Sequence, residues 1–284
     1  INNLQCPVCR PFGQRNQQME LNEWRVRGDR SAFGASQVEV VYFLLQIEVF
    51  DGVEQQGAQS RGHTRAGKRA QQIFHLGRKV QAALPGVFES VEFGEYSSLH
   101  TLLKKIPPFS KIHLANSMAV RYVNFLGKRN QEIICNRGTS GIDGSNSTAV
   151  GCTFTTKEPV TLITGDMAFF YDRNAFWHNY ATPNLRIVIL NNHAGGIFRL
   201  IEGPAKQPEL EEFFETRQKL TASQLAAEFG FEYQLVKNQE ELDKALSDFY
   251  NPSLKPKILE IESSSAKNAE ILKKVKERVK GIIS

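Results

Sequence analysis

Two stretches decide the fold of this chain: VTLITGDM at residues 160–167 and LRIVILNN at residues 185–192. Each begins as a short apolar run, which is typical of a strand buried on both faces, and each ends in polar residues. Residues 168–180, between them, have the length for one crossover helix. Because such connections are right-handed almost without exception, the unit predicts neighbouring parallel strands that end at the same edge of a sheet.

The side chains that follow these strands are an acid and an amide, Asp166 and Asn192. Open α/β sheets bind ligands at the carboxyl ends of their strands. A carboxylate oxygen with an amide oxygen suits Mg²⁺, which takes oxygen ligands and leaves room for substrate phosphates. Either residue alone has a simpler reading, as part of a turn or a strand end. Their shared edge favours a metal site.

The same alternation of strand and helix extends from about residue 108 to the C-terminus. We expect strands at 111–114, 132–135, 160–164, 185–190, 233–236 and 257–262. We expect helices at 117–126, 145–154, 170–180, 222–229, 239–249 and 266–282. Thr221 and Asn238 stand where helix N-caps belong. The pattern predicts an α/β fold: a doubly wound, parallel, six-stranded sheet with helices on both faces.

Composition and charge exclude several classes of protein. The chain has 284 residues, 41% of them hydrophobic, and a formal net charge of +5. That composition argues against wholesale disorder. Lys and Arg are scattered without an aromatic-interleaved motif, so we expect no nucleic-acid partner. No run is long enough to span a membrane, and no signal peptide is visible. Because the chain begins with Ile1 rather than Met, we expect a fragment.

The four cysteines do not indicate a metal site or an oxidising compartment. Cys6 and Cys9 form a single CxxC without a second pair or a nearby histidine, so we interpret them as incidental thiols. Cys135 and Cys152 fall in elements that we expect to be buried. The chain is therefore predicted to be cytoplasmic.

Four motifs in order resemble one enzyme family. They are ANSMAVR at 115–121, NRGTSGIDG at 136–144 followed by STA at 147–149, GDMAFFYDRNA at 165–175, and NNHAGGIF at 191–198. Together they resemble the thiamine diphosphate (ThDP) enzymes, in particular the menaquinone-pathway branch, MenD. The glycines of the second motif do not have the spacing of a dinucleotide fingerprint, and no ribose-binding acid follows them.

The resemblance implies residues that hold the cofactor and its metal. Mg²⁺, or Mn²⁺, would be bound by Asp166, Asn192 and the backbone carbonyl of Ala194. Ala194 replaces a residue that is usually glycine, so its φ must be negative. Ile142 would wedge beneath ThDP and force its bent, reactive conformation, which makes it the catalytic candidate. The remaining cofactor-binding candidates are Gly141, Gly165, Met167 and Ala168. Helix N-termini after Gly144 and Met167 would offer N–H donors to phosphate.

The same resemblance implies a substrate side. Its candidates are Ser117, Arg121, Arg137, Ile197 and Phe198. The expected substrates, 2-oxoglutarate and isochorismate, are dicarboxylates, and arginine binds carboxylates bidentately. The histidines at positions 113, 178 and 193 lack triad or zinc spacing, and we interpret them as structural.

The expected reaction is decarboxylation of 2-oxoglutarate and addition of the succinyl carbanion to isochorismate. Its product is 2-succinyl-5-enolpyruvyl-6-hydroxy-3-cyclohexene-1-carboxylate, made for menaquinone biosynthesis by a transferase of class EC 2.2.1.9. Enzymes of this family form each site with the pyrimidine-binding domain of a second subunit, as a homodimer or a dimer of dimers. The alternatives are another ThDP carboligase or decarboxylase of the acetolactate synthase type, or a noncatalytic binding domain.

The N-terminal third does not fit this picture. We divide the chain into an unassigned segment, residues 1–95, and a ThDP diphosphate- and Mg-binding domain, residues 96–284. The first is either a divergent central domain or sequence foreign to the family. Nothing in it resembles the pyrimidine-binding domain, whose glutamate activates the cofactor. We therefore expect the chain to carry half a site and to be inactive alone.

Overall fold

A computed structural model describes residues 91–127, 129–136 and 140–283, with short stretches at 75, 78–80, 82–83 and 86–88. Most of the unassigned segment, including Cys6 and Cys9, lies outside the described residues. Within the described part, no helix is both long and apolar enough to cross a membrane.

The predicted six-stranded parallel sheet is confirmed, with strand order β2-β1-β3-β4-β6-β5. Its strands are β1 Lys111–Leu114, β2 Glu132–Cys135, β3 Val160–Gly165, β4 Leu185–Asn191, β5 Glu232–Val236 and β6 Lys257–Glu262. The central strands β3 and β4 are buried along most or all of their length. This burial explains why they read as uninterrupted apolar runs.

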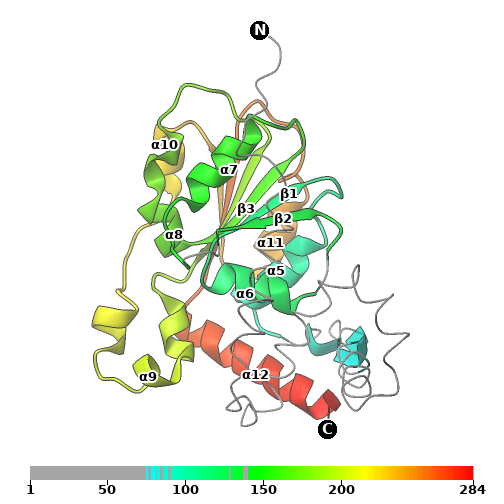
Figure 1. Ribbon diagram of the computed structural model, residues 1–284, viewed down its shortest axis with the longest axis vertical. Coiled ribbons are helices and arrows are strands. Elements are labelled where there is room, and N and C mark those ends of the chain that lie inside the picture. The colour runs from blue at the N-terminus through cyan, green and yellow to red at the C-terminus, as the bar shows by residue number, and fades with distance from the viewer. Residues whose placement is uncertain are drawn as a thin grey trace, which may run out of the picture. The chain divides into compact units, whose positions relative to one another are not determined.

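Helices cover both faces of the sheet (Figure 1). The α-helices are α5 Glu95–Leu103, α6 Met118–Phe125, α7 Ser145–Thr153, α8 Asp166–Tyr171, α9 Glu202–Ala205, α10 Ser223–Glu228, α11 Gln239–Leu246 and α12 Ser265–Ile283. Single turns of other helix types are η4 Arg173–Phe176, η5 Gly196–Leu200 and the π-turn η6 Leu210–Phe214.

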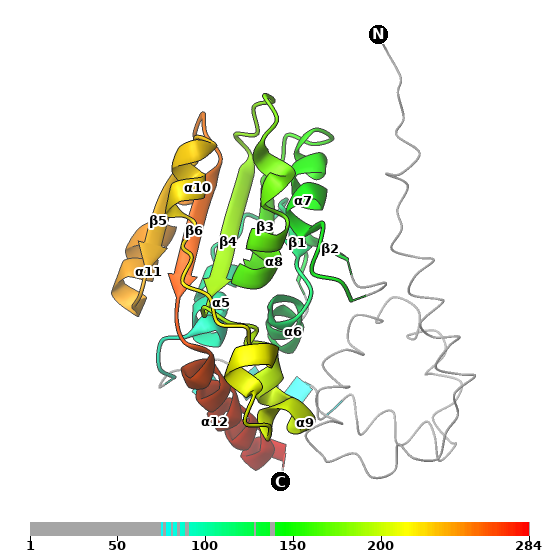
Figure 2. The same ribbon diagram turned by 90° about the vertical axis from the view of Figure 1, so that its left-hand side faces the viewer.

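The core has two layers, one on each face of the sheet (Figure 2). Alternate residues of β4 separate them: Ile187 and Ile189 pack with α7, α8 and α10, whereas Val188 and Leu190 pack with α5, α6, α11 and α12. The alternation follows from the two-residue period of a strand. Both layers are built mainly from apolar side chains.

Two local predictions were wrong. The crossover after β3 is not one helix, because α8 ends at Tyr171 and η4 follows. Asp172 instead accepts hydrogen bonds from the N–H and Oγ of Ser147, each at 2.7 Å. Thr221 does not cap α10, whose N-cap is Ala222. Asn238 does cap α11, by accepting from the N–H of Glu241 at 2.9 Å.

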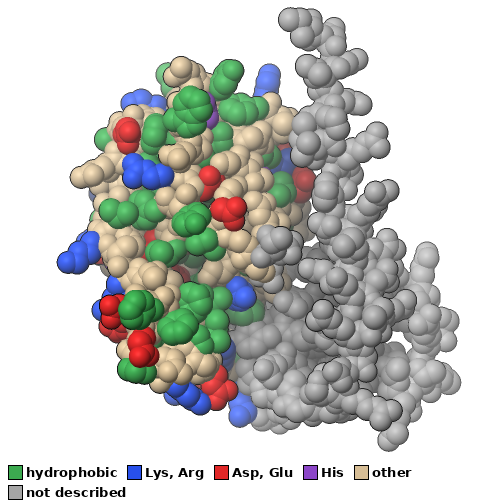
Figure 3. Space-filling model, turned by 60° about the vertical axis from the view of Figure 1, so that its left-hand side comes forward, with side chains coloured by type: hydrophobic (Ala, Val, Ile, Leu, Met, Phe, Trp, Pro, Cys, Tyr) green, Lys and Arg blue, Asp and Glu red, His purple; other side chains and the backbone are tan. Residues whose placement is uncertain are grey.

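Exposed apolar side chains form separate groups among polar ones on the face that Figure 3 shows. The most exposed aromatic residues of the described chain include Tyr171, Trp177 and Tyr180. Scattered apolar groups of this kind are ordinary on protein surfaces and do not by themselves mark an interface.

Candidate cofactor and metal site

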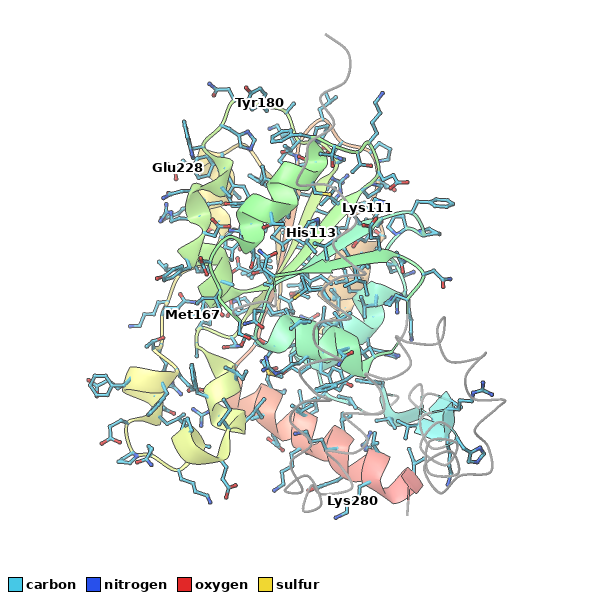
Figure 4. The ribbon with its side chains drawn as sticks, viewed as in Figure 1. Lys111, His113, Met167, Tyr180, Glu228 and Lys280 are labelled. Carbon is cyan, nitrogen blue, oxygen red and sulfur yellow. The ribbon has the colours of Figure 1, made fainter. Side chains whose placement is uncertain are left out.

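The strand register brings the acid and the amide together. Gly165, the last residue of β3, pairs with Leu190 of β4, so the chain leaves both strands at the same edge. Asp166 then begins α8, and Asn192 follows β4 directly. Figure 4 shows Met167 at the end of the sheet opposite Lys111, where β1 begins. The structure therefore places Asp166 and Asn192 at the same edge of the sheet, as predicted.

Asp166 is a buried carboxylate at the start of α8. Its side chain is 2% exposed and accepts one hydrogen bond from Gln218 Nε2 at 2.8 Å. Burial raises the pKa of Asp166 to about 6, although hydrogen bonds from Gln218 and from the backbone of Met167 lower it. A charge kept out of water in this way is stabilised by a neighbouring cation.

Asn192, at the same edge of the sheet, has an unpartnered side-chain oxygen. Its Nδ2 donates to Glu95 Oε1 at 2.5 Å. Its Oδ1 is buried and has no hydrogen-bond partner among the described residues. Buried polar atoms without partners are rare, and a missing ion is one of their ordinary explanations.

The loop after Asn192 meets the condition for a backbone ligand. Ala194 is 3% exposed and is not among the residues with positive φ; the positive value, 58°, belongs to His193. Two backbone bonds hold the loop: Gly195 N–H donates to Glu215 O at 2.6 Å, and Gln218 N–H donates to His193 O at 3.0 Å. The backbone at Ala194 therefore fits the proposed third ligand.

The oxygens of Asp166, Asn192 and the Ala194 carbonyl are suitable ligands for a hard cation. A carboxylate, an amide oxygen and a backbone carbonyl are the ligand types that Mg²⁺ accepts while it keeps positions for phosphate oxygens. The described residues contain no group of three or more His, Cys, Asp or Glu side chains that could hold a metal. A site with one carboxylate does not require such a group.

The helix N-termini at the edge differ in what they offer. As expected, α7 begins after Gly144, whose φ of 75° favours glycine. One of its first-turn donors, the N–H of Ser147, is already bound to Asp172. The other helix begins at Asp166 rather than after Met167, so Met167 and Ala168 lie in its first turn.

The other expected site residues come from the segments that follow β1, β2 and β4. Ser117, with φ of 76°, precedes α6, and Arg121 Nη1 donates to its carbonyl at 2.7 Å. Asn116 Nδ2 donates to Ser140 O, which ties this loop to the loop of Gly141 and half-buried Ile142. Ile197 and Phe198 lie in η5. Arg137 and Gly138 lie outside the described residues.

Sequence reasoning missed Glu95. It begins α5, is 1% exposed and bonds to Asn192 and to the Tyr122 hydroxyl. Burial raises the pKa of Glu95 to about 7; the nearby charge of Asp166 adds to the rise, and both hydrogen bonds oppose it. The run GEYSSLHTLL at 94–103, with apolar residues at helical spacing, was a signal for this helix.

The three histidines have different surroundings. His113 is buried in β1, and burial lowers its pKa to about 4. His178 Nδ1 accepts from the N–H of Tyr180 at 3.2 Å. His193 Nε2 lies 4.0 Å from Glu262 Oε1.

Fold and edge together define an α/β domain in which a buried carboxylate and an unpartnered amide oxygen lie at the edge where its parallel strands end. Residues 115–261, just over half of the chain, match the family model of the thiamine pyrophosphate enzyme, C-terminal TPP binding domain. The chain belongs to this family. Thiamine pyrophosphate is another name for ThDP.

Three similar proteins carry the same name. The chain is 56% identical over 189 residues to a 2-succinyl-5-enolpyruvyl-6-hydroxy-3-cyclohexene-1-carboxylate synthase of Cytophaga hutchinsonii, covering 66% of the chain and 34% of that protein. The synthase of Christiangramia forsetii is 44% identical over 183 residues, 64% of the chain and 32% of the relative. That of Bacteroides fragilis is 40% identical over 184 residues, 64% and 33%. The chain thus spans about a third of these relatives' length.

Proposed function

We propose that this chain supplies the diphosphate- and Mg²⁺-binding half of a 2-succinyl-5-enolpyruvyl-6-hydroxy-3-cyclohexene-1-carboxylate synthase. The intact enzyme decarboxylates 2-oxoglutarate and joins its succinyl unit to isochorismate. The unpartnered, buried Asn192 Oδ1, at the same sheet edge as the buried Asp166 carboxylate, carries the proposal. The names of the similar proteins support this choice of reaction.

The cation would be held by Asp166, Asn192 Oδ1 and the carbonyl of Ala194, next to the cofactor's phosphates. ThDP, when bound, supplies the centre that stabilises the carbanion left by decarboxylation. The chain's own part is to hold and bend the cofactor. Gly165, Met167 and Ala168 lie where the phosphates would approach α8, and Gly141 and Ile142 lie in the loop that precedes α7.

The substrates' carboxylates would be bound by arginine. Arg121 is held on α6 by its bond to Ser117 O, and that bond limits where the guanidinium can lie. Arg137 is the second candidate from the motif. Ile197 and Phe198 of η5 would form an apolar wall, in which Phe198 packs against Phe214 with ring centroids 5.9 Å apart. Such a pocket excludes water while it pairs the charges of a dicarboxylate.

The other half of the site would come from a pyrimidine-binding domain of a second subunit. In this proposal, that domain supplies the glutamate that activates the aminopyrimidine, and none of the described residues has this role. We therefore propose that these residues alone bind without turnover. Detectable decarboxylation of 2-oxoglutarate by the 284-residue chain alone would disprove this part of the proposal.

The test is calorimetric titration of ThDP into the intact protein, with and without Mg²⁺. We expect binding that requires Mg²⁺ and that Asp166→Ala abolishes. Asp243→Ala, which removes an exposed aspartate of α11, is the matched control and should bind like the wild type. Equal binding by Asp166→Ala would overturn the metal assignment. Turnover of pyruvate in preference to 2-oxoglutarate would instead indicate another ThDP carboligase.

A further inference from the structure

Glu95 is held at the edge of the sheet by contacts with α12. Its N–H donates to Asn268 Oδ1 at 3.1 Å. At the preceding Gly94, a Cβ would lie 2.6 Å from Ile271 Cδ1 and 2.8 Å from Asn268 Oδ1, so a larger residue would displace the chain. The start of α5 is therefore fixed from a helix that lies more than 170 residues away in the sequence.

The carboxylate of Glu95 faces the amide of Asn192. Its Oε1 accepts from Asn192 Nδ2 at 2.5 Å, and the buried hydroxyl of Tyr122 also hydrogen-bonds to it. The oxygen and nitrogen of an asparagine amide are close in size, so shape alone does not select one orientation. A carboxylate does select one, because it accepts hydrogen bonds and attracts the NH₂ end.

We propose that Glu95 is a positioning residue that fixes the amide of Asn192 with its NH₂ turned inward, so that Oδ1 faces the cation. This inference rests on the proposed metal site at Asp166 and Asn192. Without the acceptor at Glu95, the amide can rotate and present NH₂, which a cation repels. Partners that orient metal ligands commonly change metal affinity 10–100-fold when they are removed.

The unpartnered Asn192 Oδ1 is the observation that separates this role from simple packing. If the amide of Asn192 served packing alone, its oxygen would be expected to accept from a donor of its own, as the oxygen of Asn191 does. Instead the nitrogen is bound to Glu95 and the oxygen has no partner among the described residues, at the sheet edge where the buried Asp166 begins α8. A buried acceptor left unpartnered at the edge that also holds a buried carboxylate fits a cation.

The first test measures Mn²⁺ binding to the intact protein at fixed ThDP, from the electron paramagnetic resonance signal of free Mn²⁺. Glu95→Met removes the acceptor at similar length, and Glu95→Gln keeps a carbonyl that can accept from Asn192. We expect Mn²⁺ affinity to fall at least about tenfold in Glu95→Met and less than about threefold in Glu95→Gln. Thermal unfolding without cofactor shows whether each variant is folded.

Each result of this test decides the inference. Glu95→Met with wild-type affinity would overturn it, and so would equal losses in Met and Gln, which would indicate a purely electrostatic effect of the charge. A wild-type protein that binds ThDP without Mn²⁺ or Mg²⁺ would contradict the proposed function instead. The two failures are therefore distinguishable.

A second test exchanges the two groups and remains decisive if Glu95→Met does not fold. Asn192→Asp alone places two buried carboxylates in contact, and we expect Mn²⁺ binding to be lost. Adding Glu95→Gln restores a donor and an acceptor with their roles reversed, while a carboxylate oxygen still faces the cation. We expect the double variant to recover at least about tenfold in affinity over Asn192→Asp. No recovery would overturn the positioning role.

Discussion

Asn191 and Asn192 are neighbours in sequence. The Nδ2 of each donates a hydrogen bond to a buried glutamate at 2.5 Å. They differ in the other half of the amide. Asn191 Oδ1 accepts from the N–H of His193 at 3.0 Å and from Gln218 Nε2 at 3.2 Å. Asn192 Oδ1 is buried without a partner among the described residues. The same two residue types thus make one closed pair and one open pair.

The two glutamates repeat the contrast. Glu260, with no exposed surface, accepts from Asn191 Nδ2, from the N–H of Ala222 at 2.9 Å and from the Tyr233 hydroxyl at 2.6 Å. Glu95 has the amide of Asn192 and the Tyr122 hydroxyl, and the carboxylate of Asp166 is near it. The Asn191–Glu260 pair joins three segments of the fold. The Asn192–Glu95 pair leaves an acceptor for a ligand. We therefore expect the Asn191–Glu260 pair to govern stability and the Asn192–Glu95 pair to govern binding.

Removing the closed pair should have the largest effect. Glu260→Ala leaves the Ala222 N–H and the Tyr233 hydroxyl without this acceptor, and leaves Asn191 Nδ2 with the Leu220 carbonyl alone. Because each buried unsatisfied donor costs about 1–3 kcal/mol, we expect the free energy of unfolding to fall by about 4 kcal/mol. Urea denaturation followed by circular dichroism measures it.

Glu260→Gln is the control for that experiment, since its carbonyl still accepts and should restore part of the loss. Below the unfolding transition, either variant should still bind ThDP with Mg²⁺. A loss under about 1 kcal/mol in Glu260→Ala would show that the closed pair does not hold these segments together.

Breaking the open pair should affect binding more than stability. Asn192→Ala removes a proposed ligand, and we expect the Mg²⁺-dependent affinity for ThDP to fall on the order of 100-fold, the upper end of what partner residues contribute. Its unfolding free energy should fall by only about 1–2 kcal/mol. Calorimetry and urea denaturation of the same sample measure both.

Asn191→Ala is the matched comparison and should show the reverse pattern, with a larger loss of stability. If both variants lost stability and affinity in the same proportion, the distinction between a closed and an open pair would be wrong.

His113 tests whether an unpartnered buried atom is enough to mark a ligand site. Its Nε2 also lacks a partner among the described residues, yet it lies within β1. Burial lowers its pKa from 6.5 to about 4, so the folded protein disfavours the charged form. Its contribution to stability is full above pH 6.5 and is lost as the pH falls through 4. At pH 5 the loss is about 2 kcal/mol.

The measurement is urea denaturation at pH 7 and pH 5 for the wild type and His113→Leu. The variant should lose about 2 kcal/mol less than the wild type over this interval. ThDP and Mg²⁺ binding at pH 7 should be the same in both. Weaker binding by His113→Leu would mean that the orphan nitrogen of His113 serves a ligand after all.

The sheet and the acid–amide edge could be predicted because both depend on local pattern. Strands such as β4 are short apolar runs bounded by polar residues, and parallel strands bring their carboxyl ends together whatever their order. The order β2-β1-β3-β4-β6-β5 is not encoded in such a pattern. It depends on which helix faces pack against which strands.

What could not be predicted depends on contacts between distant residues. Glu95 meets Asn192 across 97 positions, and Glu260 meets the N–H of Ala222 across 38. The second contact replaces the local cap expected from Thr221. Asp172 accepts a hydrogen bond from Ser147, 25 positions earlier, at the point where α8 ends. In each case a polar side chain that local rules place in a helix or loop finds a stronger partner in the folded chain.

A third asparagine provides the smallest effect and the reference for the other two. Asn238 is exposed, and its Oδ1 caps α11 by accepting from the N–H of Glu241 at 2.9 Å. Asn238→Ala should cost about 1 kcal/mol of unfolding free energy, and Asn238→Asp, which keeps an acceptor, should cost less. Neither should change ThDP or Mg²⁺ affinity, because the cap lies outside the set of residues that meet at Asp166 and Asn192. A change in affinity equal to that of Asn192→Ala would mean that binding follows global stability rather than the open amide.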